Sequence, residues 1–155
     1  MKFFSFFTSW FRRSDKAPAA VVDSGMPWNK VLATSFADLE DRRRYERCIA
    51  RGKSPAFCRG LGDPGIGWLD NVTGTEEENI CALPPEIWRP KFSAKANAHR
   101  RKVQVRYKGR IVTGYLGDTM PAHPKNGAGI DLNPGFLQAL GLSAPCKVTV
   151  EWRWA

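Results

Sequence analysis

Two aspartates in the C-terminal half of the chain are best placed for acid–base chemistry. Asp118 lies in a loop bounded by Gly117 and Gly129, at the end of a predicted strand, and Asp131 precedes a predicted helix. A carboxyl group that faces a groove and is partly removed from water holds its proton to higher pH and can donate it. The alternative for both residues is structural, because aspartates before turns and helices commonly accept hydrogen bonds from backbone amides.

A glycine-rich segment over residues 59–75 supplies further candidates for a binding site. It contains Asp63 and Trp68, and we expect a structured loop that lines a cleft, since its glycines do not open a helix after a strand as nucleotide-binding loops do. Trp68 and Trp88 are candidates for stacking on sugar rings, with core packing as the alternative. His123, in a proline-bounded loop after the first aspartate, is the last candidate, with an ordinary loop histidine as the alternative.

The elements that position these residues are mostly strands. Alternating apolar and polar residues predict an antiparallel hairpin over 103–116 that turns at Lys108-Gly109. The same alternation predicts a last strand over 147–154. Between them, Asn133 and Pro134 have the residue types of a helix N-cap and first helical position, which predicts a short helix.

The N-terminal part of the chain has a different character. Residues 1–34 combine an aromatic and basic start with a polar linker that shows no periodicity. A helix is predicted over 35–51, with Ser35 as N-cap, acidic residues early, arginines late and Gly52 after its end. The expected parts here are a segment and linker over 1–34 and a helical extension over 35–58.

The charge of the chain bears on its partners. The formal net charge of +9 attracts polyanions such as nucleic acid, anionic lipid or acidic wall polymers. Zinc fingers, phosphate loops and RNA-binding signatures are absent from the sequence, so we expect no specific nucleic-acid binding and no cofactor. The aromatic and basic N-terminal region could bind an anionic surface or a partner protein. A soluble domain with a basic helix is the simpler alternative.

The chain has four cysteines, Cys48, Cys58, Cys81 and Cys146. Their irregular spacing, without C-x-x-C and without a nearby histidine, argues against a zinc site. An even number permits two disulfides in an oxidising compartment, and pairing Cys48 with Cys58 and Cys81 with Cys146 is the simplest of the three connectivities. Four buried free thiols in a cytosolic or virion protein are the alternative.

The order of the predicted elements resembles the double-psi β-barrel of rare lipoprotein A and the expansins. The order is strand, turn, strand, Asp-containing loop, Ile-Asp-Leu, short helix ending in Leu-Gly, and final strand. It is carried by Ala82-Leu83-Pro84-Pro85, residues 109–121, residues 129–134, and Leu140-Gly141 with residues 148–152. The resemblance implies a mainly β fold: a small double-psi β-barrel with short helices over 59–155, preceded by the N-terminal helical extension.

The resemblance also implies a function. In lytic members of the family an aspartate acts as general acid and then base, and it corresponds to Asp118; an aspartate in the Ile-Asp-Leu element of expansins corresponds to Asp131. The implied activity is a peptidoglycan lytic transglycosylase in the cell envelope or outside the cell. The family histidine before Leu-Pro is replaced here by Asn79-Ile80-Cys81. The alternatives are an expansin-like module that binds wall glycan without turnover, and a structural barrel in a phage virion or secretion assembly.

Overall fold

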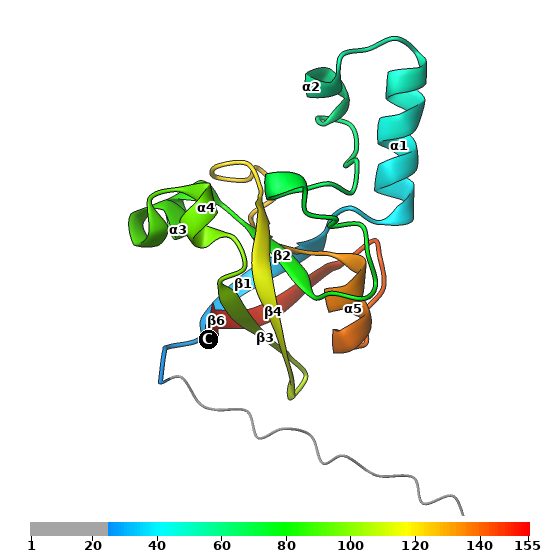
Figure 1. Cartoon of the computed structure of the whole chain (residues 1–155). Helices are drawn as coiled ribbons and strands as arrows, with labels where there is room; N and C mark the ends of the chain where they lie inside the picture. Colours follow the sequence, from blue (N-terminus) through cyan, green and yellow to red (C-terminus); the bar gives the residue numbers. More distant parts are fainter. Residues whose placement is uncertain (1–24) are drawn as a thin grey trace, which may run out of the picture.

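The predicted hairpin and last strand are present in the computed structural model, which describes residues 25–155 (Figure 1). β3 (Lys102–Tyr107) and β4 (Arg110–Thr119) pair antiparallel, and β6 (Lys147–Trp154) pairs with β3. Lys108 and Gly109 connect β3 to β4 with φ angles of 46° and 80°. Two consecutive positive φ angles match the twist of a two-residue hairpin, which explains the glycine.

Three further strands close the sheet into a barrel: β1 (Asn29–Ser35), β2 (Ile80–Leu83) and β5 (Ala128–Leu132). Around the barrel the order is β1-β5-β2-β4-β3-β6. The β1/β5 and β2/β4 pairs are parallel, and the other neighbours are antiparallel. The prediction of a mainly β protein with a small double-psi β-barrel and short helices is confirmed.

The start of the barrel differs from the prediction. Residues 29–35, expected as linker and helix start, form β1 and pair with both β5 and β6. The helix α1 (Leu39–Ala50) begins later, because the carboxylate of Asp38 accepts hydrogen bonds from the amides of Glu40 and Asp41 and so acts as N-cap in place of Ser35. The helical extension therefore lies between two barrel strands, and the barrel is not confined to 59–155.

A disulfide joins α1 to the short helix α2 (Pro55–Cys58). It links Cys48 to Cys58, as predicted, and the two helices stand side by side at one end of the barrel (Figure 1). The second predicted bond is absent, since Cys81 and Cys146 are free and buried. Both pack as small apolar side chains in the barrel core, and burial raises the pKa of each thiol.

The remaining helices cover the barrel. They are η1 (Trp68–Asp70), α3 (Pro85–Phe92), α4 (Lys95–Ala98) and α5 (Pro134–Leu140). α5 begins as predicted, with Asn133 as N-cap and Pro134 in the first turn. Asn133 is fully buried and accepts hydrogen bonds from the amides of Phe136 and Ile80, while its amide nitrogen donates to three carbonyls before β2. It thus fastens α5 to the barrel. Among residues 25–155, no helix has the length and apolar character needed to cross a bilayer.

Candidate functional site

Asp118 and Asp131 line the same groove at one end of the barrel. The groove has a volume of about 720 Å³, and its walls also include Asp63, Trp68 and Lys95. The strand β4 brings Asp118 to the groove and β5 brings Asp131. β4 and β5 are not neighbours in the barrel, because β2 lies between them.

The two aspartates are aligned by β2 and by two bulges. Ala82 of β2 is in register with Asp118 on one side and with Asp131 on the other. Residues in register point to the same face of a sheet, so the small side chain of Ala82 forms the floor between the carboxyls. A register shift leaves Gly117 as an extra residue in β4, and another leaves Gly129 extra in β5. Bulges of this kind re-aim the side chains that follow them.

The glycine-rich loop forms the wall beside Asp118, as expected for a structured loop. A bridge between Ile66 and Val72 closes the loop on itself. Gly67 lies directly against the aspartate: a Cβ atom there would be 3.0 Å from Asp118 Oδ2 and 2.8 Å from the carbonyl oxygen of Gly117. The close approach explains why a glycine occupies this position.

Burial controls the charge of the site. It raises the pKa of Asp118 to about 6, against the opposing effect of a 2.8 Å hydrogen bond from the amide of Thr119. Burial likewise raises the pKa of Asp131 to about 6, although the hydroxyl of Thr34 donates to its carboxylate. The pKa of Asp63 is also raised by burial, and its negative charge further disfavours ionisation of the other two.

Two cations at the groove partly offset the rise in the pKa of Asp118. Arg59 and Lys95 both line the groove and lower the pKa of Asp118. A carboxyl with a pKa near 6 exchanges its proton close to neutral pH, which suits a group that gives a proton and takes one back. Within residues 25–155, no cluster of His, Cys, Asp or Glu is arranged to hold a metal ion.

Hydrogen bonds in the site differ in part from those expected. The structural alternative for Asp131 was hydrogen bonding to backbone amides, but its carboxylate accepts from the Thr34 hydroxyl, and Asn133 accepts from the amide at the start of α5. The reason is strand geometry: Asp131 belongs to β5 and is in register with Thr34 of β1.

The two tryptophans occupy different places. Trp68 lines the groove but is only 5% exposed, with the ammonium of Lys95 5.6 Å from its ring centre. Trp88 is 2% exposed and lies outside the lining, so it is not an open stacking platform. Its ring packs edge-on against Trp68 at 4.8 Å, and its Nε1 donates to Thr119 Oγ1 at 3.2 Å. Trp88 therefore supports the end of β4, next to Asp118.

His123 lies outside the groove. Its side chain is 86% exposed, and Nδ1 lies 3.2 Å from a carboxylate oxygen of Glu86 on α3. The same carboxylate accepts a hydrogen bond from the backbone amide of His123. These contacts hold the loop after β4 on α3.

Sequence reasoning missed Arg59, Lys95, Thr34 and Ala82. Lys95 lies in a stretch rich in basic residues, and Arg59 follows Cys58 in the glycine-rich segment. No local pattern distinguishes these residues, because they come from segments far apart in the chain.

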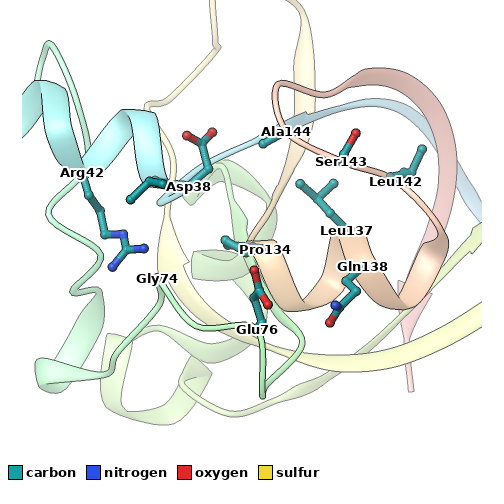
Figure 2. Close-up of a pocket in the computed structure, with 11 residues that line it drawn as sticks. Asp38, Arg42, Gly74, Glu76, Pro134, Leu137, Gln138, Leu142, Ser143 and Ala144 are labelled. Atoms are coloured by element: carbon teal, nitrogen blue, oxygen red, sulfur yellow. The ribbon is translucent and has the colours of Figure 1, made fainter.

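A second cavity, of about 350 Å³, lies between α1 and α5 (Figure 2). Asp38, Arg42 and Glu76 contribute its charged groups, and Leu137 contributes an apolar wall. Asp38 is already engaged as the N-cap of α1, and the stem of Arg42 packs against the backbone of Gly74. This cavity contains none of the predicted site residues.

The comparisons with known proteins bear on the fold. No protein-family model matches the chain, and no curated protein matches its sequence. Among solved structures, Streptomyces papain inhibitor is similar, with a TM-score of 0.50 and 15% sequence identity over 83% of this chain and 94% of that protein. At this identity the likeness concerns the arrangement of the chain alone. It shows a six-stranded barrel of the double-psi type.

Proposed function

We propose that this barrel binds cell-wall glycan in the groove and cleaves it, with Asp118 as the proton donor. The observation that carries the proposal is the pair of carboxyls on either side of Ala82, each with a pKa raised to about 6 and both lining one open groove. The proposal places the protein in the cell envelope or outside the cell, where peptidoglycan is found.

Asp118 acts first as an acid and then as a base in this mechanism. Its carboxyl gives a proton to the glycosidic oxygen as the bond from that oxygen to the sugar C1 breaks. The carboxylate that remains takes a proton from the hydroxyl that attacks C1. If that hydroxyl is the C6 hydroxyl of the same sugar, the product is a 1,6-anhydro ring; if it is water, the product is a reducing end. The same carboxyl thus returns to its protonated form.

Asp131 has a supporting role. Two strand spacings separate its Cα from that of Asp118, roughly 10 Å, so both carboxyls can reach one bound disaccharide. Ionised Asp131 stabilises positive charge that develops on the sugar ring in the transition state. Arg59 and Lys95 line the same groove, and their positive charges limit the rise in the pKa of Asp118.

The test is incubation of the full chain with purified peptidoglycan sacculi, followed by analysis of the released fragments. We expect fragments with 1,6-anhydro ends from the wild-type protein. Asp118→Asn should lower the rate of release by ~10²–10⁴-fold, since the amide cannot exchange the proton. Asp131→Asn should lower it less. Asp70→Asn, which removes an exposed carboxylate of the same loop wall, is the matched control and should release fragments at the wild-type rate.

Four results would change the proposal. Reducing ends in place of anhydro ends would indicate hydrolysis with the same proton donor. Sacculus binding without release would indicate a non-catalytic glycan-binding barrel. Wild-type release by Asp118→Asn would refute the role of Asp118. Absence of both binding and release would favour a structural barrel.

A further inference from the structure

A basic cleft lies away from the groove, on the arm formed by residues 39–61, which includes α1 and α2. The cleft has a volume of about 340 Å³. Four cations and three apolar or sulfur-containing side chains line it, and no acidic side chain does: Arg44, Arg47, Arg51, Lys53, Cys48, Phe57 and Leu61. Figure 1 shows the two helices of the arm projecting beyond the barrel.

Helix geometry and the disulfide create this cleft. Arg44, Arg47 and Arg51 follow one another at intervals of three and four residues, so they lie along one side of α1 and its end. Cys48 lies on the same side, and its bond to Cys58 holds α2 beside the row of arginines. The positions of the cations and of the apolar residues on α2 are therefore fixed relative to one another.

The apolar residues of the cleft are exposed. Phe57 is 56% exposed and Leu61 is 53% exposed. The 3.0 Å hydrogen bond from the amide of Leu61 to the carbonyl of Cys58 holds the turn after α2. Two large exposed apolar side chains beside a row of cations form an amphipathic surface, which matches a partner that is both apolar and anionic.

The charge of the arm is only partly neutralised within the protein. Its cations outnumber its acids: Arg42, Arg43, Arg44, Arg47, Arg51, Lys53 and Arg59 against Glu40, Asp41 and Glu46. Arg44 pairs with Asp41, and Arg47 pairs with Glu40 at 2.8 Å. Across residues 25–155, no carboxylate forms an ion pair with Arg51 or Lys53.

We propose that the arm docks on the surface of a lipid bilayer that contains anionic headgroups. Phe57 and Leu61 enter the boundary between headgroups and acyl chains, and Arg51 and Lys53 contact lipid phosphates. An anionic polymer in water would satisfy the cations but leave both apolar side chains exposed, whereas a bilayer covers both. The cleft shares no lining residue with the groove, so the proposal is independent of glycan cleavage.

The test is co-sedimentation of the full chain with vesicles of phosphatidylcholine alone or mixed with phosphatidylglycerol. We expect binding to the mixed vesicles only, weakened by added salt. Arg51→Gln with Lys53→Gln should lower the partition coefficient by roughly 25-fold, because each cation at an anionic surface contributes roughly five-fold. Phe57→Ser with Leu61→Ser should also lower it, since both side chains are exposed and their removal does not open the core.

The matched control is Lys108→Gln with Arg110→Gln, which removes the same charge from the β3–β4 turn, at the opposite end of the molecule in Figure 1. This control should bind like the wild type. Equal losses in the arm and control variants would show a response to net charge alone and overturn the proposal. Binding that survives the Arg51/Lys53 change would place the contact elsewhere, such as in the aromatic and basic first 13 residues. Failure of the wild type to bind mixed vesicles would also overturn it.

Discussion

Replacing Asp118 by asparagine should stabilise the folded protein at pH 8 and leave its stability nearly unchanged at pH 4. Burial raises the pKa of Asp118 in the folded state, so the fold disfavours its ionised form. Asparagine has almost the same shape, and its carbonyl oxygen can still accept the 2.8 Å hydrogen bond from the amide of Thr119. The substitution therefore removes the charge and keeps the contact.

The size of the stability gain follows from the pKa of Asp118, which rises from an ordinary 3.8 to about 6. At pH 4, the carboxyl is protonated in the folded state and about half protonated in the unfolded chain, so the effect of its raised pKa on stability is only roughly 0.5 kcal/mol. As the pH rises toward 6 and beyond, the unfolded chain ionises freely while the folded chain must ionise a partly buried group, so stability is lost. Each pKa unit corresponds to about 1.4 kcal/mol, which sets an upper limit of roughly 3 kcal/mol for the gain at pH 8.

The assay is urea unfolding of the wild type, Asp118→Asn and the exposed control Asp70→Asn at both pH values. We expect the free energy of unfolding of Asp118→Asn to exceed that of the wild type at pH 8 only. A loss of stability at both pH values would refute the reasoning, because it would mean that the ionised carboxylate holds the fold through Thr119. If Asp118→Asn is more stable than the wild type but no longer releases glycan, Asp118 is a residue retained for function at a cost in stability.

Three further outcomes are expected. Ala82→Leu should abolish sacculus binding, measured by co-sedimentation, because the larger side chain fills the floor between the two carboxyls; binding that persists would move the ligand out of the groove. Gly67→Ala should cost about 1–3 kcal/mol in urea unfolding, because its Cβ would overlap the carbonyl of Gly117. Asn133→Ala should cost about 3 kcal/mol or more by the same measurement, since it leaves several buried backbone groups without partners; a loss below about 1 kcal/mol would contradict that role.

Several features follow from local sequence alone. The hairpin over 103–116 is determined by alternation of apolar and polar residues and by Gly109, whose positive φ few other residues accept. Asn133 and Pro134 specify the start of α5 through their own chemistry. The Cys48–Cys58 disulfide spans only 10 positions, so a short connection between α1 and α2 is enough to bring the two cysteines together. Each of these signals is contained within a short stretch of the chain.

The remaining features depend on contacts between segments that are distant in sequence. β1 shows no alternation of apolar and polar residues, since Val31, Leu32 and Ala33 are consecutive. It exists because it pairs with β5 and β6, about a hundred positions away along the chain. The same pairing gives Asp131 the hydroxyl of Thr34 as partner, and the position of β2 between β4 and β5 sets Ala82 between the two aspartates. Local sequence indicates the two candidate carboxyls and the elements that carry them. Their shared groove, their removal from water and the cations beside them arise only when the barrel closes, because desolvation and charge proximity depend on contacts between segments distant in sequence.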